Sequence, residues 1–468
     1  MEIRNICCIG AGYVGGPTMA VIAKYSPNIQ VNVVDINSER IAQWNEDDLS
    51  NLPIYEPGLE EIVRECRGKN LHFSTEIPAN IKRADMIFIS VNTPTKQRGI
   101  GAGQALDLKY VEASSREIAK YAEGFTIVVE KSTLPVKTAQ TIKSILDANT
   151  SSEIHSEKRT FAVLSNPEFL AEGTAINDLN NPDRVLIGGD NNEAIDSLVN
   201  IYSNWLDKSK VLTTDLWSSE LSKLIANAFL AQRISSINTI SALCEATGAH
   251  IKDVALAVGM DKRIGKYFLN SGPGFGGSCF KKDISNLVYI SNHYGLTEVA
   301  EYWQKVLEIN SWQQKRFVEL IVKKMFGTIS SKKIAILGFS FKSNTNDTRE
   351  SPAIYICQKL IEEGAILKIY DPKVNQQQIR NDLDGSIENS NNPNDSKKWF
   401  FSNSLYETFI DTDAAIFITE WEEFQNLNWS KISPKMRKPA WIFDTRSILE
   451  IDEVRDNGMH IWQVGCVA

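Results

Sequence analysis

The sequence predicts an α/β protein: two Rossmann-like, doubly wound domains joined by a central helical domain with one long helix. Short apolar runs alternate with helical patterns in the first third of the chain, and the alternation returns after Gly327. Such alternation is typical of parallel sheets covered by helices. Between these regions an apolar stripe at helical spacing runs from Ser218 to about Gly248. Because 468 residues exceed what one hydrophobic core usually serves, we expect three domains, over residues 1–217, 218–327 and 328–468.

Runs rich in Val and Ile give the expected strands. In the first domain these runs are Ile6–Ile9, Val31–Val34, Met86–Val91, Ile127–Glu130 and Phe161–Leu164. In the third domain they are Lys333–Leu337, Ile366–Tyr370, Ala414–Thr419 and Trp441–Phe443.

Helical spacing of apolar residues predicts helices over Gly15–Tyr25, Ser38–Trp44, Ser218–Gly248, Glu298–Lys324 and Ser351–Glu362. Ser218 or Ser219 is expected to cap the long helix, and Gly248 to end it. The polar stretches Asn149–Lys158 and Asn375–Lys398 are expected to be exposed loops.

Composition excludes several classes of protein. Lys and Arg number 50 against 58 Asp and Glu, a net charge of −8, which argues against a nucleic-acid binder that works through bulk positive charge. No apolar run reaches the roughly 18 residues of a membrane helix, and the N-terminus lacks the layout of a signal peptide. The seven cysteines are scattered and the five histidines lack ligand spacing, so we expect no disulfide framework and no metal. These features predict a cytoplasmic protein.

The first strand leads directly into a dinucleotide-binding fingerprint, Gly10-Ala11-Gly12-Tyr13-Val14-Gly15. Gly10 permits the tight turn, Gly12 lets a pyrophosphate approach the backbone, and Gly15 allows close helix–strand packing. The second strand ends at Asp35, whose carboxylate is placed to hold a ribose 2′-hydroxyl and to repel a 2′-phosphate. NAD is therefore favoured over NADP, with Arg40 as a residue that can stack on adenine or meet a phosphate.

The third domain repeats the strand pattern with a weaker glycine signal. Its first strand is followed by a single glycine, Gly338, so we expect a Rossmann-like sheet that binds a smaller phosphate-bearing ligand instead of a dinucleotide. Lys342 and Arg349 lie in the following loop and are placed for anionic groups.

The segment from Gly272 to Asp283 holds four glycines in six positions and then Cys279 at an expected helix start. A helix N-terminus and neighbouring cations lower the pKa of a thiol, so Cys279 is predicted to be reactive. Asp283 follows one helical turn later on the same face. The other six cysteines sit in apolar patterns and are expected to be packing residues.

Two further pairs are spaced i, i+4. Lys223 and Asn227 lie on the long central helix, and Glu168 and Glu172 follow a buried strand. By its spacing alone, the lysine is interpreted as a solvent-facing residue at the edge of the core. The two glutamates are interpreted as ordinary acidic residues at a helix start.

Together these segments resemble the UDP-glucose/GDP-mannose dehydrogenase family, and within it the UDP-glucose 6-dehydrogenases. The resemblance spans nearly the whole chain in order, and Phe275–Asp283 is its most specific part. It is carried by Gly10–Gly15, Val91-Asn92-Thr93-Pro94-Thr95, Glu130-Lys131-Ser132-Thr133, Asn166–Glu172, Phe275–Asp283 and Gly338–Lys342.

The resemblance implies a four-electron oxidation: UDP-glucose, two NAD and water give UDP-glucuronate and two NADH. Lys223 and Asp283 would orient or activate a water during the first oxidation. Cys279 would trap the aldehyde as a thiohemiacetal and carry the later thioester. Glu168 would be the general base of thioester hydrolysis, and Thr133 and Asn227 would hold active-site water or oxyanion.

The resemblance also implies the binding residues. Around NAD, in addition to the fingerprint, Asp35 and Arg40, it places Val91, Asn92, Thr93, Pro94, Thr95, Ser132, Thr133, Glu172, Cys279 and Arg349. Around UDP-glucose it places Glu168, Phe169, Leu170, Ala171, Glu172, Lys223, Asn227, Asn270, Ser271, Gly272, Phe275, Gly276, Phe341, Lys342 and Arg446. Arg263 would reach the substrate of a neighbouring subunit, which implies a homo-oligomer, at least a dimer. Pro273 departs from the family pattern and puts the grip on uridine in doubt.

Three alternatives remain at this stage. The same chemistry can act on another nucleotide sugar, GDP-mannose or a UDP-N-acetylhexosamine. A two-electron dehydrogenase of the hydroxy-acid or phosphogluconate type would use a lysine alone. A catalytically silent NAD-binding protein would keep the fold and lose the thiol chemistry.

Overall fold

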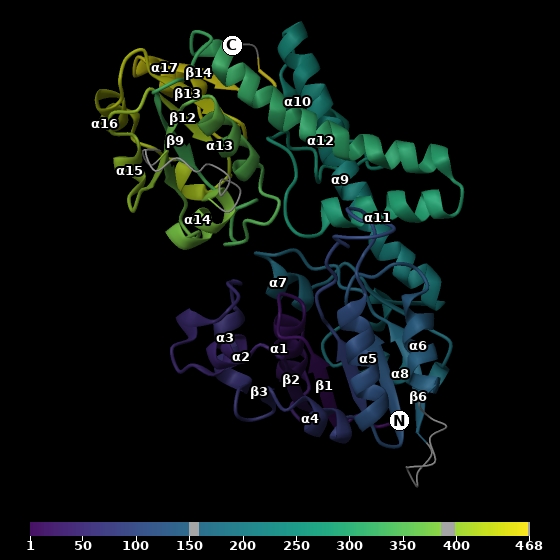
Figure 1. The fold of residues 1–468 in the computed structure, drawn as a ribbon. Coiled ribbons are helices and arrows are strands. Elements are labelled where there is room, and N and C mark those ends of the chain that lie inside the picture. Colours follow the sequence, from purple (N-terminus) through teal and green to yellow (C-terminus); the bar gives the residue numbers. More distant parts are fainter. Residues whose placement is uncertain (149–158, 385–397, 467–468) are drawn as a thin grey trace. The chain divides into compact units, whose positions relative to one another are not determined.

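The computed structural model describes residues 1–148, 159–384 and 398–466. The chain forms two compact units, Met1–Ala226 and Asn227–Ala468, in which sheets and helices follow the predicted order (Figure 1). The predicted α/β fold class is confirmed, while the three-domain boundaries at 217 and 327 stay predictions. Within the described residues, no helix combines the length and the apolar composition that crossing a membrane requires.

The first unit is built on an eight-stranded sheet in the order β3-β2-β1-β4-β5-β6-β7-β8. Neighbouring strands are parallel except for the antiparallel pair β6 and β7. The strands are β1 (Asn5–Ile9), β2 (Gln30–Val34), β3 (Leu71–Ser74), β4 (Met86–Ile89), β5 (Phe125–Glu130), β6 (Thr160–Ser165), β7 (Val185–Gly189) and β8 (Val211–Thr214). The order β3-β2-β1-β4 reverses between β1 and β4, which is where doubly wound sheets bind dinucleotides.

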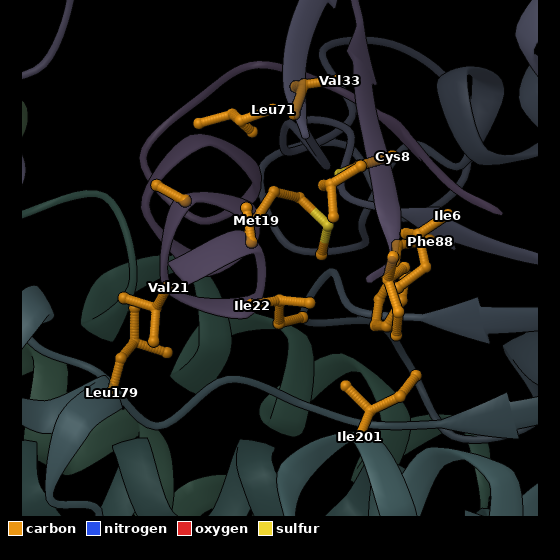
Figure 2. Packing of buried hydrophobic residues seen from close by; sticks show 14 of the residues in the cluster. Ile6, Cys8, Met19, Val21, Ile22, Val33, Leu71, Phe88, Leu179 and Ile201 are labelled. Atoms are coloured by element: carbon orange, nitrogen blue, oxygen red, sulfur yellow. The ribbon is translucent and has the colours of Figure 1, made fainter. Parts of the chain in front are cut away.

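Helices cover both faces of this sheet, so alternate residues of each strand enter different cores. Ile6 and Cys8 of β1 pack with α1, whereas Cys7 and Ile9 belong to the cluster on the other face. Figure 2 shows Met19 and Ile22 of α1 against Ile6, Cys8 and Phe88. The helices of the unit are α1 (Gly15–Tyr25), α2 (Ser38–Asn45), α3 (Leu59–Cys66), α4 (Ile77–Arg83), α5 (Lys109–Tyr121), α6 (Thr138–Ala148), α7 (Ala175–Asn180) and α8 (Asn192–Tyr202).

Four helices follow the first sheet: α9 (Leu216–Thr247), α10 (Ile251–Gly259), α11 (Phe280–His293) and α12 (Thr297–Lys324). The predicted cap of the long helix α9 is wrong. The helix begins earlier because the carboxylate of Asp215 accepts a hydrogen bond from the N–H of Ser218 at 2.9 Å. Gly248 ends it as predicted, with a φ of 90° and its N–H donated to the carbonyl of Cys244 at 2.9 Å.

The second unit holds a six-stranded parallel sheet in the order β11-β10-β9-β12-β13-β14. Its strands are β9 (Lys333–Leu337), β10 (Ile366–Tyr370), β11 (Trp399–Phe401), β12 (Ala414–Phe417), β13 (Trp441–Asp444) and β14 (His460–Gln463). Its helices after α12 are α13 (Pro352–Glu362), α14 (Gln376–Asp384), α15 (Leu405–Thr408), α16 (Trp429–Ile432) and α17 (Ile451–Asp456).

The predicted loop over Asn375–Lys398 is wrong in its first part. Helix α14 forms there because Ile379 and Leu383, one turn apart, are fully buried in the core of the second unit. The rest of that stretch, and the predicted loop over 149–158, lie outside the described residues.

Candidate active site

The turn after β1 uses its three glycines for different reasons. Gly10 has a φ of 112°, and a Cβ there would lie 2.2 Å from the carbonyl oxygen of Ser90. A Cβ at Gly15 would lie 2.0 Å from the carbonyl oxygen of Gly10. A Cβ at Gly12 would meet no heavy atom of a non-neighbouring residue within 4 Å. The fold therefore requires Gly10 and Gly15, whereas the space at Gly12 is open to a ligand.

Asp35 lies 8% exposed directly after β2. Its carboxylate accepts hydrogen bonds from the N–H groups of Ala11 and Asn37, both at 2.9 Å. Arg40 Nη1 pairs with the same carboxylate at 3.2 Å. Because Arg40 is engaged with Asp35, the site keeps a carboxylate where a 2′-phosphate would need a cation, which fits NAD.

The loops after β4 and β5 meet beside this turn, since carboxyl ends of neighbouring parallel strands share one edge of the sheet. Ser132 Oγ donates to the carbonyl of Val91 at 2.7 Å, and Thr93 Oγ1 donates to the carbonyl of Thr133 at 3.2 Å. The predicted cofactor residues of the first unit therefore line one edge: Gly10–Gly15, Asp35, Val91–Thr95, Ser132 and Thr133.

Glu168 follows β6 and is held by a buried cation that sequence reasoning did not assign. Lys131, 3% exposed, places Nζ 2.8 Å from Glu168 Oε2. Burial by itself would raise the pKa of the Glu168 carboxyl, but the Lys131 ammonium and the N–H of Phe169 outweigh it, and that pKa is lowered. Lys131 belongs to a segment that carries the family resemblance, and this was the only signal for it in the sequence.

Lys223 reaches the same neighbourhood within the first unit. Its Nζ lies 5.2 Å from the ring centroid of Phe169, and Arg184 Cζ lies 4.0 Å from that ring. The loop that follows Phe169 is held by a hydrogen bond from the N–H of Ala171 to the Asp178 carboxylate at 2.9 Å. The structure thus brings together the predicted residues Lys223, Glu168 and Phe169, with Leu170, Ala171 and Glu172 following in the same loop.

In the second unit, Cys279 is exposed at the N-cap of α11. The N–H of Asp283 donates to the carbonyl of Cys279 at 2.8 Å, so the predicted helix start and spacing are confirmed. Asn227 Nδ2 donates to Asp283 Oδ2 at 2.6 Å, and Asp283 is fully buried. A thiol at a helix N-terminus next to a buried carboxylate–amide pair suits nucleophilic chemistry.

The glycine-rich loop before Cys279 is clamped by amides. The N–H of Phe275 donates to Asn310 Oδ1 at 2.8 Å, and Asn310 Nδ2 returns a bond to the Phe275 carbonyl at 3.1 Å. A Cβ at Gly274 would lie 2.5 Å from Asn310 Oδ1. A Cβ at Gly276 would lie 2.6 Å from the carbonyl oxygen of Glu350. Only glycine therefore fits the closest approaches of this loop.

The remaining predicted substrate residues of this unit fall into two groups. Arg446 Nη2 donates to the carbonyl of Phe341 at 3.3 Å, and the Phe341 ring lies against the backbone of Gly277. This group also includes Gly272, Gly276 and Lys342. Arg349, predicted to bind NAD, lies beside it, since its carbonyl accepts from the N–H of Gly277 at 2.8 Å. Arg263 is apart from them, with its side chain 89% exposed and paired with Asp261.

Three family models match almost end to end. They describe the NAD binding domain, the central domain and the UDP binding domain of the UDP-glucose/GDP-mannose dehydrogenase family, over residues 4–206, 217–312 and 335–451. The chain belongs to this family. It is therefore an NAD-dependent oxidoreductase, as the family resemblance implied, and the fingerprint's preference for NAD agrees with this.

Similar proteins agree with this assignment. A UDP-glucose 6-dehydrogenase of Glycine max is 54% identical over 98% of this chain and 97% of its own, and that of Drosophila melanogaster is 54% identical over 98% and 96%. The solved structure of a UDP-glucose dehydrogenase from Pyrobaculum islandicum matches with a TM-score of 0.83 at 27% identity, covering 100% of this chain and 98% of its own.

In this member of the dehydrogenase family, the turn after the first strand of the second sheet can be compared with the dinucleotide turn of the first sheet. Gly338 N–H donates to the carbonyl of Tyr370 at 2.8 Å, as Gly10 N–H does to that of Val34 at 2.7 Å. Asp371, which corresponds to Asp35, is already bonded by the N–H groups of Phe339 and Ser340 and by the Trp421 indole at 3.2 Å. Asp371 therefore accepts a side-chain donor, the Trp421 indole, where Asp35 accepts the Arg40 guanidinium.

Within the same loop, helix α13 begins only at Pro352, far along the chain from Gly338. In the first unit, by contrast, α1 begins at Gly15. The described part of this loop therefore lacks the short turn from strand to helix that binds a pyrophosphate in the fingerprint. This agrees with the prediction of a smaller phosphate-bearing ligand.

The sequence reasoning also overlooked a buried acid pair. Glu130 ends β5 at 2% exposure and faces Glu220 of α9. Glu220 accepts the N–H groups of Lys137 and Ala139 at 2.6 and 2.7 Å. Burial and the Glu220 charge raise the pKa of Glu130 well above its ordinary value, and burial also raises the pKa of Glu220 although backbone N–H groups oppose it. No short-range spacing rule joins these two residues.

Proposed function

We propose that this chain oxidises UDP-glucose to UDP-glucuronate with two NAD, through intermediates linked to Cys279. The proposal rests on the exposed thiol of Cys279, which lies at the N-cap of α11 after a glycine-rich loop. The same chain also contains a dinucleotide fingerprint. An alcohol-to-aldehyde oxidation alone would need no such thiol, whereas a thiol gives the second oxidation a covalent route to the acid.

In the first oxidation, the C6 hydroxyl loses a proton and the C6 hydrogen leaves as hydride. Bound NAD supplies the hydride acceptor for both oxidations. Lys223 and Asp283 orient the water that receives the proton, and the Lys223 ammonium stabilises negative charge on the C6 oxygen. Asn227, which donates to Asp283 at 2.6 Å, holds that carboxylate in place.

In the second oxidation, the Cys279 sulfur adds to the aldehyde carbon and forms a thiohemiacetal. Loss of hydride from this carbon, and of the hydroxyl proton to water, gives a thioester. Water then attacks the thioester carbonyl, Glu168 takes a proton from the water, and the carbon–sulfur bond breaks. The thiol is restored and UDP-glucuronate leaves with its carboxylate.

The binding roles follow the family pattern. Gly10–Gly15, Asp35, Arg40, Val91–Thr95, Ser132, Thr133, Glu172 and Arg349 bind NAD. Asn270–Gly272, Phe275, Gly276, Phe341, Lys342 and Arg446 join the Glu168–Glu172 loop around UDP-glucose. Arg263, which is exposed, serves the site of a partner copy in a homo-oligomer. We place the enzyme in the cytoplasm, with an NAD domain over 1–217, a helical domain over 218–327 and a UDP-sugar domain over 328–468.

The test is the yield of NADH for each sugar consumed. Purified protein is incubated with NAD and, in separate reactions, UDP-glucose, GDP-mannose and UDP-N-acetylhexosamines. We expect two NADH per UDP-glucose and little signal with the other sugars. One NADH per sugar would contradict the thioester route, and silence with UDP-glucose would refute the substrate. Turnover that survives Cys279→Ser unchanged would also exclude the thiol.

A further inference from the structure

Lys131 lies buried just after β5, where its ammonium meets three acceptors. Nζ is 2.8 Å from Glu168 Oε2, 3.0 Å from Asn166 Oδ1 and 3.2 Å from the hydroxyl of Tyr202. An ammonium carries three donors, so this set satisfies it. Tyr202 donates in turn to Asn166 Oδ1 at 2.7 Å, and Asn166 Nδ2 donates to the carbonyl of Leu186 at 2.8 Å. Groups from the loop after β6, from β7 and from α8 thereby fix the position of the charge.

Glu168 receives bonds on both oxygens. Oε1 accepts the N–H groups of Phe169 at 2.8 Å and Leu170 at 3.1 Å. Oε2 accepts Lys131 and, at 3.5 Å, the hydroxyl of Thr18 on α1. The carboxylate is thus held in one orientation by backbone on one side and by a cation on the other.

The titratable groups around Glu168 come from four elements. Lys131 follows β5, Tyr202 is on α8, Lys223 is on α9 and Arg184 stacks on the neighbouring Phe169 ring. Of these, Lys131 forms the direct ion pair, and it is the cation with the largest effect in lowering the pKa of Glu168. Without it, burial would dominate and raise that pKa.

Water can reach this pair. A cavity of about 280 Å³ is lined by Lys131, Glu168 and Tyr202, together with polar groups such as Asn181 and Asp183. One water occupies roughly 30 Å³ of liquid volume, so the cavity has room for several, and its polar lining gives them partners. A base that must deprotonate water needs such access.

We propose that Lys131 is the positioning residue that keeps Glu168 ionised and aimed, so that Glu168 can act as base in thioester hydrolysis. This inference rests on the proposed function. Lys131 acts through Glu168, since its ammonium donors are taken by Glu168, Asn166 and Tyr202. Its effect falls on one step: water loses a proton to Glu168, the water oxygen bonds to the thioester carbon, and the bond to the Cys279 sulfur breaks.

The test is the pH dependence of Lys131→Met. At about pH 7 we expect kcat to fall by roughly 10²-fold, the order that a general base contributes. Activity should recover as the pH rises, because Glu168 becomes ionised again at higher pH. The ratio kcat/KM, which reports steps before the acyl-enzyme, should change by less than about threefold. A fast burst of two NADH per active site should precede slow turnover, with the acyl group on Cys279 visible by mass spectrometry.

Three further variants separate this role from a structural one. Lys131→Arg keeps the charge and should restore a near wild-type pH profile. Lys143→Met removes a lysine from an exposed pair with Asp190 and should leave activity unchanged. Glu168→Gln combined with Lys131→Met should be no slower in hydrolysis than Glu168→Gln alone, since Lys131 acts through Glu168.

Several results would overturn the inference. A Lys131→Met enzyme that is equally slow at every pH, or that lacks the burst, has lost something other than the ionisation of Glu168. If Lys131→Met does not fold, Lys131→Arg decides: a near wild-type pH profile supports the role, and a low rate that does not change with pH refutes it. Wild-type enzyme that makes no NADH from UDP-glucose would instead refute the proposed function.

Discussion

Replacing Gly12 by alanine should separate cofactor binding from stability. A Cβ at this half-buried position meets no heavy atom of a non-neighbouring residue within 4 Å, and the backbone of Gly12 lies outside the left-handed region. Alanine therefore fits the unliganded fold. By restricting the unfolded chain, Gly12→Ala should raise the free energy of unfolding by about 0.4–1 kcal/mol.

The same methyl group occupies the space through which a pyrophosphate would approach the backbone. Loss of one charge-assisted hydrogen bond to a backbone N–H costs about 1.5–3 kcal/mol, which is roughly a 10- to 100-fold rise in the Kd for NAD. Gly15→Ala is the matched contrast. Its Cβ would lie 2.0 Å from the Gly10 carbonyl oxygen and 3.2 Å from Cys8 Sγ, and the overlap should cost about 3 kcal/mol of stability.

The assay has two parts: urea unfolding of both variants without ligand, and calorimetric titration of each folded variant with NAD. We expect Gly12→Ala to be at least as stable as the wild type and to bind NAD weakly, and Gly15→Ala to be destabilised. Wild-type NAD affinity in Gly12→Ala would refute the pyrophosphate argument. A destabilised Gly12→Ala would show that the turn, and no ligand, requires the glycine.

Three more predictions concern single residues. Of the seven cysteines, Cys279 alone is exposed, so an aromatic disulfide reagent should titrate one thiol in the native protein and seven after unfolding, and Cys279→Ser should titrate none before unfolding. The raised pKa of Glu130 stabilises the fold below its unfolded pKa, and this contribution is lost as the pH rises through the folded pKa. Glu130→Gln should therefore add about 1–3 kcal/mol to the free energy of unfolding near pH 8 and little near pH 4, and an equal gain at both would contradict the assignment. Gly277 has a φ of 82° and its Cβ would meet the Phe341 ring at 3.0 Å, so Gly277→Ala should lower kcat about tenfold or more by shifting Cys279, as a steady-state assay would report.

The parts of the fold that sequence reasoning predicted correctly are those with a local cause. The run Gly15–Tyr25 is helical by its own spacing, and the strands of both sheets carry their own apolar patterns. The position of Cys279 at a helix start also follows from its immediate neighbours, since glycines end the preceding loop. Where a local cue was shared by several residues, as at the start of α9, the prediction chose a serine and the structure uses Asp215.

Helix α14 shows the limit of composition as a guide. Its surface is so polar that the segment resembles a loop, yet Ile379 and Leu383 are fully buried. Two apolar residues one turn apart are enough once a core is present to receive them, and the sequence does not say where that core lies.

The sequence by itself determined the fold class, the dinucleotide turn and the thiol at a helix start. Each depends on residues that are neighbours in the chain, or on backbone angles that only glycine adopts readily. Only the tertiary structure decided that Lys131 meets Glu168, that Glu130 faces Glu220, and that the Asp371 carboxylate accepts the N–H of Phe339. These are relations between strands and helices distant in sequence, and burial gives them their strength. No local pattern records which charges folding will enclose together.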